Sequence, residues 1–301
     1  MDIAVTGSTG LIGTALLSSL RADGHRVVPV TRSAGGDRDA IRWDPAAGTI
    51  DASAFEGFDA VVHLAGEGIA AGPWTDAQRR RIHDSRSQGT ALLAEALAGL
   101  DRKPAVLVSG SAIGFYGDRG DEVLTEASPS GTDFLSEVCR DWEAPTTTAA
   151  DADIRVAIIR TGIVLDPKGG SLGKQLLAFK LGLGAKAGRG DQWISWITLR
   201  DEVAAIRHAI DDESVSGPVN LVGPNPVTNA AFTDAVGEAL HRPTFLTIPR
   251  AMRHLPFGIG PLVQSLLFTS DRVRPAVLEA SGFTFSDPDL GPALAGLLPR
   301  R

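Results

Sequence analysis

Cysteine and long apolar runs are scarce in this chain. Cys139 is the single cysteine among 301 residues, so no internal disulfide can form, which fits a reducing compartment. No apolar run approaches the roughly 18 residues of a membrane-spanning helix, and we expect a soluble cytoplasmic protein that does not enter membranes. The six histidines form no pair or triplet at metal-ligand spacing, so no metal site is predicted.

Basic residues are also fewer than acidic residues. The net charge is −7 and the pI is about 5.4, so the chain has no excess of basic residues to offset repulsion from phosphates, and we expect no nucleic-acid partner. The length of 301 residues allows one large or two moderate domains with a substantial core.

A glycine-rich turn follows the first apolar segment of the chain. Residues 3–13 form a short strand pattern that leads into Gly7, Gly10 and Gly13, and residues 11–22 then show helical spacing of apolar side chains. Gly7 permits a tight turn, Gly10 lets the backbone approach a phosphate, and Gly13 lets the helix pack closely on the strand. The order of strand, turn and helix predicts a dinucleotide site. The alternative is a glycine turn that serves only to pack this unit.

The end of the second predicted strand indicates which dinucleotide is bound. Residues 27–31 lead directly into Arg32 and Ser33, with no carboxylate to hold a ribose 2′-hydroxyl. A guanidinium suits a 2′-phosphate, so the sequence favours NADP(H) over NAD(H). The alternative is a solvated surface arginine. Pro29 lacks a backbone donor, and we expect a local bulge there.

Strand and helix patterns alternate through the first half of the chain. Apolar strands separated by helices predict an α/β fold with a doubly wound parallel sheet of the Rossmann type. From about Pro167 glycines become frequent, and the last eighty residues read as helical with breaks. We therefore expect a dinucleotide-binding domain over residues 1–166, with a returning segment near 197–222, and a smaller, mostly helical substrate domain in the remainder of 167–301. The predicted strands are residues 59–65, 105–109, 155–160 and 218–222, and the predicted helices are residues 75–100 and 133–148.

Sequence motifs are spread over nearly the whole chain. They are residues 6–13, 63–66, 84–90, 109–117, 134–143, 160–165, 193–197, 220–228, 242–245 and 281–285, with Trp74. These motifs resemble those of the extended short-chain dehydrogenase/reductases, and more closely those of one atypical branch of epimerase-family oxidoreductases. The resemblance implies a nucleotide-binding fold with a small substrate domain. It supplies no physiological substrate.

The glycine turn, the strand ends and this resemblance together define the predicted cofactor-binding residues. They are Gly7, Thr9, Gly10, Leu11, Ile12, Gly13, Thr31, Arg32, Ser33, Leu64, Ala65, Gly66, Arg86, Ser109, Arg160 and Thr161.

The chain departs from the superfamily at the catalytic pair. The resemblance implies Tyr-x-x-x-Lys on one helix, in which the tyrosine transfers a proton while the lysine lowers its pKa and holds the nicotinamide ribose. If Glu143 marks the register of that helix, these two positions hold Leu135 and Cys139. The usual dyad is therefore absent.

Ser111, Tyr116 and Arg86 are the catalytic candidates. Ser111 is expected at a strand end that faces the cofactor crevice. Tyr116, the single tyrosine, is a candidate for proton transfer if a cation such as Arg86 stabilises its phenolate. The alternative is that Tyr116 packs in its loop and Arg86 pairs with Glu67 or Asp84.

Two functions agree with these features. The first is an oxidoreductase or epimerase in which NADP(H) exchanges hydride with a carbonyl or carbinol carbon of a small molecule, a nucleotide sugar being one candidate. The second is a non-catalytic protein that senses NADP(H), which the missing dyad favours. Neither the substrate nor the oligomeric state follows from the sequence.

Overall fold

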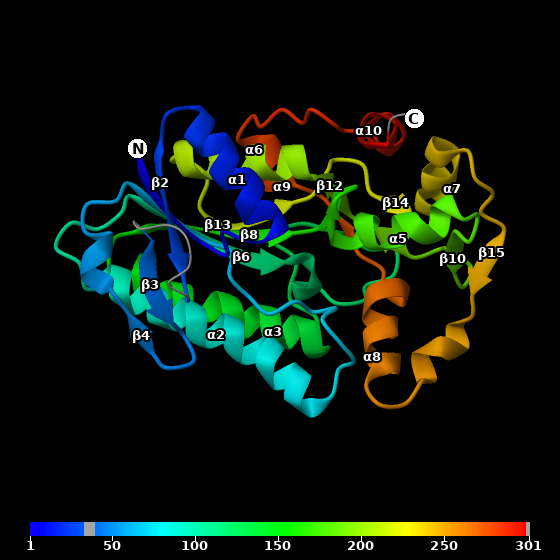
Figure 1. Cartoon of the computed structure of the whole chain (residues 1–301), viewed down its shortest axis with the longest axis horizontal. Coiled ribbons are helices and arrows are strands. Elements are labelled where there is room, and N and C mark those ends of the chain that lie inside the picture. Colours follow the sequence, from blue (N-terminus) through cyan, green and yellow to red (C-terminus); the bar gives the residue numbers. More distant parts are fainter. Residues whose placement is uncertain (33–39, 299–301) are drawn as a thin grey trace.

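The computed structural model describes residues 1–32 and 40–298 and centres on an eight-stranded sheet (Figure 1). Neighbouring strands run parallel, except that β4 is antiparallel to β3. The predicted α/β class with a doubly wound parallel sheet is confirmed. In spatial order the strands are β13 (Gly217–Leu221), β8 (Arg155–Thr161), β6 (Val106–Ala112), β5 (Ala60–His63), β1 (Asp2–Thr6), β2 (Arg26–Thr31), β3 (Ile41–Asp44) and β4 (Thr49–Ile50).

The strand order reverses beside β1. From β1 the chain adds β2 and β3 on one side, and then adds β5, β6, β8 and β13 on the other. The C-terminal ends of β1 and β5 are adjacent, because Thr6 pairs with His63. Open parallel sheets bind ligands at such a switch point, outside the carboxyl ends of the strands.

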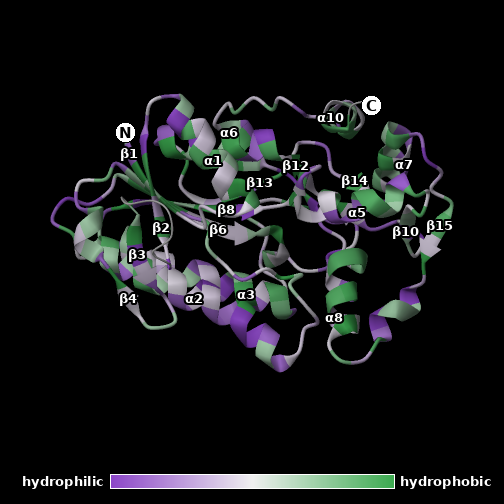
Figure 2. Ribbon diagram, viewed as in Figure 1, coloured by the Kyte–Doolittle hydropathy of each residue, from purple (hydrophilic) through white to green (hydrophobic). Residues whose placement is uncertain are grey.

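Helices cover both faces of the sheet. In Figure 1 α1 (Leu11–Ala22) and α6 (Leu199–Asp211) lie above the sheet, while α2 (Asp76–Ala98) and α3 (Phe134–Glu143) lie below it. The short α4 (Thr147–Ala150) continues the lower layer. Each helical layer buries its own cluster of apolar side chains against the central strands. Figure 2 colours these strands largely as hydrophobic. This double cover explains why the strands read as continuous apolar runs.

Pro29 lies in a strand without a bulge, contrary to our expectation. Asp2 to Thr6 pair with Arg26 to Val30 in an unbroken register, with Val5 opposite Pro29. On its other side β2 pairs with β3 only at Val30 and Thr31. Among the described residues Pro29 therefore has a strand partner on one side only, and its missing N–H interrupts no second ladder there.

The second half of the chain adds short helices and strand pairs at the C-terminal side of the sheet. The right half of Figure 1 shows α5, α7 and α8, with two of these strands at the right-hand edge of the molecule and α10 at the top. The helices are α5 (Gly170–Lys180), α7 (Asn229–Leu240), α8 (Ile259–Val263), α9 (Ala276–Ala280) and α10 (Leu290–Leu297). The paired strands are β7 (Val123–Leu124) with β16 (Arg272–Val273), β9 (Ile163–Asp166) with β12 (Trp196–Thr198), β10 (Ala185–Ala187) with β15 (Leu246–Ile248), and β11 (Trp193–Ile194) with β14 (Val227–Thr228).

None of the helices in the described residues combines the length and apolarity needed to cross a bilayer.

Candidate functional site

The glycine turn after β1 leaves no room for side chains at two of its three glycines. Gly7 adopts φ +65°, and a Cβ placed there would lie 2.6 Å from the carbonyl carbon of Leu64. A Cβ at Gly13 would lie 2.2 Å from the carbonyl oxygen of Gly7. The Gly10 N–H donates to that same oxygen over 3.0 Å. The turn thus has the shape expected of a phosphate cradle.

The N-terminus of α1 follows this turn and is accessible from solvent. Gly10 is its N-cap and, having no side chain, forms no capping hydrogen bond. The first N–H groups of a helix lack intrahelical partners and favour an anion. Thr9 and Gly10 are exposed, and Leu11 and Ile12 are half-buried. These residues fit a bound pyrophosphate.

A buried histidine holds the neighbouring strand end in place. Leu64 N–H and Ala65 N–H both donate to Oγ1 of Thr6, over 3.0 and 3.2 Å. The Thr6 hydroxyl proton is therefore directed to Nδ1 of His63, 2.8 Å away, which leaves Nε2–H to donate to Oγ1 of Thr90. Burial lowers the pKa of His63 to about 4, so the ring is neutral. Sequence reasoning missed this network, although a histidine inside an apolar strand was its visible sign.

Arg32 and Arg42 line a hollow of about 290 Å³ beside the ends of β2 and β3. Arg42 lies opposite Thr31 in the parallel register, so the second guanidinium belongs to the same edge as the predicted one. No sequence pattern pointed to Arg42, because only the pairing of β2 with β3 brings it there. Ser33, also predicted here, lies outside the described residues. The other lining residues are Trp43, Asp44, Thr49, Ile50 and Asp51.

Ser111 lies at the end of β6 and contacts a buried ion pair. Its hydroxyl donates to Oε1 of Glu143 over 2.6 Å. Arg160, opposite Ser111 in β8, donates to the same carboxylate from Nε and Nη2 over 2.9 and 2.8 Å. The guanidinium also lies 3.4 Å from the ring centroid of Phe115. Sequence reasoning used Glu143 only as a register mark and missed this contact.

The Tyr116 side chain is enclosed by the protein. The cation that contacts its hydroxyl is Arg160, not Arg86 as predicted. The side chain is 0% exposed. Its hydroxyl accepts from Nη1 of Arg160 over 3.1 Å and donates to Oδ1 of Asn220 over 2.7 Å. Burial raises the pKa of Tyr116, and the charge of Arg160 offsets this in part. The phenol is thus kept protonated and already hydrogen-bonded, as in the alternative in which Tyr116 packs in its loop.

Leu135 and Cys139 both face the loop that follows β6. A Cβ at Gly114 would lie 3.3 Å from Cβ of Leu135 and 3.9 Å from Sγ of Cys139. Burial, with the charge of Glu143, raises the pKa of Cys139 to about 12. Neither side chain can exchange a proton readily near neutral pH, so the usual dyad has no substitute at these two positions.

Arg86 does not stabilise the Tyr116 phenolate as expected, because Arg160 makes that contact. Arg86 is buried on α2, with Cζ 4.8 Å from the ring centroid of Trp142. Among the described residues it forms neither of the ion pairs considered: Asp84 pairs with His83, and Glu67 accepts from Gln78.

Two further predicted residues, Ser109 and Thr161, lie in β6 and at the end of β8. The Ser109 hydroxyl is buried and has no hydrogen-bond partner within the described chain. Thr161, at the end of β8, donates to Oε1 of Glu202 over 2.8 Å. Glu202 is fully buried, and burial raises its pKa to about 8. Sequence reasoning missed Glu202, since a glutamate in the first turn of a helix is usually exposed.

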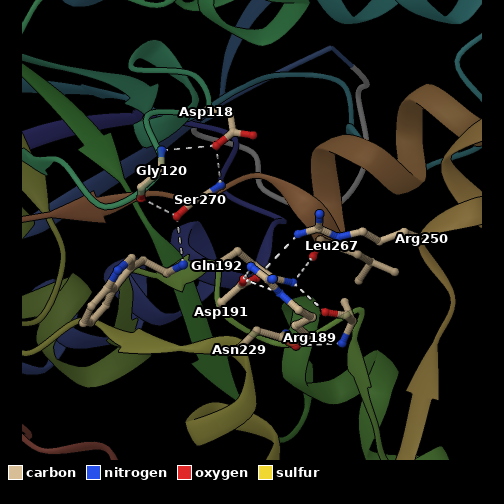
Figure 3. A network of polar contacts seen from close by, with 11 residues as sticks. Asp118, Gly120, Arg189, Asp191, Gln192, Asn229, Arg250, Leu267 and Ser270 are labelled. Carbon is tan, nitrogen blue, oxygen red and sulfur yellow. Dashed lines mark hydrogen bonds and ion pairs between the residues drawn. The ribbon is translucent and has the colours of Figure 1, made fainter.

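Polar contacts fasten the C-terminal segment over the loop that follows β6 (Figure 3). Ser270 donates from Oγ to the Gly120 carbonyl over 2.6 Å and from its N–H to Asp118 over 3.3 Å. Gln192 donates to the Leu267 carbonyl over 2.5 Å. Nearby, Arg189 and Arg250 both pair with Asp191. In the same region the Ala187 N–H donates to Oδ1 of Asn229 over 2.7 Å.

A parallel sheet of this strand order, with a glycine turn and an open helix N-terminus at its switch point, defines a Rossmann-type fold. The chain belongs to the NAD dependent epimerase/dehydratase family, which it matches over residues 3–223. Residues 249–297 match a further domain described only as a domain of unknown function, DUF1731. The resemblance drawn from the motifs is thereby confirmed.

Similar proteins span the whole chain. An epimerase family protein of Mycobacterium bovis is 42% identical over 292 residues, 97% of this chain and 96% of that one. Epimerase family protein SDR39U1 of Homo sapiens is 36% identical, with 98% of each chain covered. The crystal structure of the human protein (isoform 2) with NADPH has a TM-score of 0.90 at 34% identity and 100% coverage of both chains. A nucleoside-diphosphate sugar epimerase from Corynebacterium glutamicum has a TM-score of 0.82 at 39% identity, covering 99% of this chain and 58% of that one.

Proposed function

We propose that this chain binds NADP(H) and exchanges hydride with a carbonyl or carbinol carbon of a small molecule. The observation that carries the proposal is the turn at Gly7 and Gly13, where backbone occupies the space that side chains would need and the open N-terminus of α1 is left for an anion. The human relative crystallised with NADPH supports the same cofactor here.

The proposed preference for NADP(H) over NAD(H) rests on the residues at the ends of β2 and β3. Arg32 and Arg42 would hold the 2′-phosphate of the adenosine ribose, and no carboxylate ends β2 to select a free 2′-hydroxyl. We further propose that residues 1–166, with the segment near 197–222, form the dinucleotide-binding domain. The remainder of 167–301 would then close over a substrate, with a nucleotide sugar as one candidate.

Ser111 is the residue that we assign to the substrate oxygen. NADP(H) supplies or accepts the hydride when it is bound. The ionised Glu143 carboxylate can only accept, so the Ser111 hydroxyl donates to it and keeps its lone pairs for a donor. A carbinol hydroxyl is such a donor: as its carbon gives up hydride, its proton would pass to Oγ of Ser111 while the Ser111 proton passes to Glu143, and the reverse transfers would protonate a carbonyl oxygen. Arg160 holds the carboxylate in position, and Tyr116 acts through Arg160 rather than touching the substrate.

The second candidate is a non-catalytic protein that responds to NADP(H). It is favoured by the side chains at the dyad positions, Leu135 and Cys139, and by the fully enclosed hydroxyl of Tyr116. Under this alternative the cofactor binds in the same way but no substrate is turned over.

Two measurements test these functions. Fluorescence titration with NADPH and NADH should show binding with preference for NADPH, and the absence of any response to either would overturn both candidates. A panel of carbonyl compounds and nucleotide sugars is then scored for NADPH consumption, and the nucleotide sugars and simple carbinols are scored with NADP+ for NADPH formation. We expect Ser111→Ala to abolish turnover at unchanged NADPH affinity and Tyr116→Phe to reduce it less. Binding without turnover would favour the non-catalytic alternative.

A further inference from the structure

Apolar side chains from three separate segments meet at the position of the missing dyad tyrosine. Leu135 occupies that position on α3, and a Cβ at Gly114 in the loop after β6 would lie 3.3 Å from its Cβ. Leu135 and Leu262 of α8 are half-buried and belong to the same apolar cluster as the buried ring of Trp74. The other members are Ile69, Ile82, Phe134 and Val138. The resemblance gives this position to the residue that exchanges a proton with the substrate, so we expect the substrate to lie against this cluster.

The C-terminal segment joins the cluster through a close backbone contact. The Trp74 N–H donates to the carbonyl of Gly258 over 3.0 Å. Gly258 adopts φ +78°, and a Cβ placed there would lie 2.5 Å from the carbonyl carbon of Trp74. The Trp74 ring packs edge-on against Phe134, with the ring centroids 5.1 Å apart, and its Nε1 donates to the Ile69 carbonyl over 2.8 Å. Both N–H groups of Trp74 therefore have partners within the protein, and its ring offers a ligand apolar surface.

The segments that meet at the cluster contain no basic residue. Residues 64–75 include Glu67 as their only charged residue, and residues 109–117 and 255–270 include none. Figure 2 shows α8 in the hydrophobic colour. Proteins bind a diphosphate with guanidinium or ammonium groups, or with the N–H groups of an open helix N-terminus. These three segments provide no side-chain cation for one.

The two helices that begin at the cluster also have acidic, capped N-termini. Thr75 caps α2 with its hydroxyl, and Asp76 lies in the first turn. Asp133 caps α3 with its carboxylate, and Glu137 lies in the first turn. By contrast, Gly10 leaves the N-terminus of α1 uncapped, and no acidic residue follows in its first turn. Carboxylates at a helix N-terminus occupy the place that an anionic ligand would take, so α2 and α3 disfavour a diphosphate whereas α1 favours one.

Arg79 of α2 is a cation that contacts the cluster. Its Cζ lies 4.1 Å from the centroid of the Phe134 ring. The aromatic face attracts the guanidinium, and the methylene stem adds apolar surface. A diphosphate bound at this cluster would have to recruit Arg79, so a variant at this position separates an anionic from an apolar substrate.

We infer that the substrate is an uncharged carbonyl or carbinol compound whose apolar group packs against Leu135, Trp74 and Leu262, and not a nucleotide diphosphate sugar. This inference rests on the proposed function, because it takes Ser111 as the residue that binds the reacting oxygen. An apolar group that leaves water for this cluster gains affinity in proportion to the area that it buries. Specificity then comes from the apolar side chains that replace and surround the dyad tyrosine.

Phenyl alkyl ketones and UDP-glucose are the probes that distinguish the two substrate classes. The protein is first saturated with NADP+, which cannot reduce a ketone and which blocks the dinucleotide site. It is then titrated calorimetrically with acetophenone, butyrophenone, hexanophenone and UDP-glucose. We expect the Kd of the ketones to fall by up to about fourfold for each added methylene, and UDP-glucose not to bind. With NADPH in place of NADP+, kcat/KM for ketone reduction should rise in the same order.

Variants of the cluster test the residues themselves. For Leu262→Ala we expect the Kd of hexanophenone to rise about tenfold, with a smaller rise for acetophenone and an unchanged Kd for NADPH. Leu266→Ala, 42% exposed in the same C-terminal segment, is the matched control and should bind every ligand as the wild type does. Arg79→Leu should retain ketone binding, because it removes the charge and keeps an apolar side chain.

Each outcome decides the inference. Unchanged NADPH binding by Leu262→Ala shows that the variant is folded, so weaker hexanophenone binding then supports the assignment, and Leu135→Ala repeats the comparison if Leu262→Ala does not fold. Binding of UDP-glucose that Arg79→Leu abolishes, or ketone affinity that is independent of chain length, overturns it. A wild-type chain that binds NADPH but no ketone leaves the proposed function standing and removes only this substrate class. A wild-type chain that binds no NADPH overturns the proposed function, and with it this inference.

Discussion

Arg160 donates two parallel hydrogen bonds to the carboxylate of Glu143, from Nε over 2.9 Å and from Nη2 over 2.8 Å. The two side chains are only 4% and 10% exposed. This pair joins strand β8 to the end of helix α3, and the hydroxyls of both Ser111 and Tyr116 attach to it. The geometry of the candidate active site therefore depends on this ion pair.

Glu143→Gln should destabilise the fold, because it leaves the Arg160 guanidinium buried without a counter-charge. Breaking a buried pair in this way typically costs about 3–5 kcal/mol. The free energy of unfolding in urea measures the loss. Glu137→Gln, at an exposed position on the same helix, is the control. Equal stability of the two variants would contradict a structural role for the pair.

Arg42→Ala and Arg32→Ala should each weaken NADPH binding selectively. Each removes a guanidinium from the hollow assigned to the 2′-phosphate, and loss of a hydrogen bond to a charged group costs roughly tenfold in affinity. NADH, which lacks this phosphate, should bind both variants as it binds the wild type. Fluorescence titration measures both constants, with Lys103→Ala, exposed before β6, as the control. If NADH affinity fell by the same factor, the phosphate assignment would be wrong.

Acid should destabilise the fold through His63. Its folded pKa, about 4, lies below the ordinary value of 6.5, so the unfolded chain binds the proton more readily. Stability is thus fully present above about pH 6.5 and decreases as the pH falls toward 4, by up to about 3 kcal/mol. Protonation would also remove the acceptor at Nδ1 that positions Thr6.

His63→Gln should therefore show a smaller loss of unfolding free energy between pH 7 and pH 4 than the wild type. Thermal and urea denaturation across this range provide the measurement. His254→Gln, at an exposed position, should retain the wild-type pH dependence. An identical profile for wild type and His63→Gln would show that this imidazole does not titrate as described.

Alkaline pH should destabilise the fold through Glu202. Its folded pKa, about 8, lies above the ordinary value of 4.5, so the folded chain holds the proton and stability decreases as the pH rises from about 4.5 to 8. The loss is at most about 5 kcal/mol. Glu202→Gln cannot ionise and still offers an acceptor to Thr161, so its unfolding free energy should exceed that of the wild type at pH 9.

The measurement for this variant is denaturation at pH 5 and pH 9. Glu238→Gln, at an exposed position on α7, should change with pH as the wild type does. The prediction fails if Glu202→Gln is no more stable than the wild type at the higher pH.

Short-range sequence patterns predicted the fold class and the shape of the glycine turn. The spacing of Gly7, Gly10 and Gly13 after an apolar strand is a short-range signal, and each strand between helices is recognisable from its own residues. The same local reasoning showed that the Tyr-x-x-x-Lys pair is absent. It failed at Pro29, because the bulge expected there depends on how much of β2 has a second neighbour.

The hydrogen-bond and ion-pair partners of the polar side chains could not be predicted from local sequence patterns. Tyr116 bonds to Asn220, 104 residues away along the chain, and the cation beside it comes from β8 rather than α2. Arg42 joins Arg32 because two strands pair, and Glu202 is buried because α6 packs against the sheet.

The sequence by itself determined the fold class, the glycine turn and the loss of the usual dyad, because each depends on residue types at short spacing. Only the tertiary structure decided which charges meet. It paired Arg160 with Glu143 and, within the part of the chain that the structure describes, gave Arg86 no ion pair, because the packing of α2 and α3 on parallel strands sets the distances between side chains that are remote in the chain.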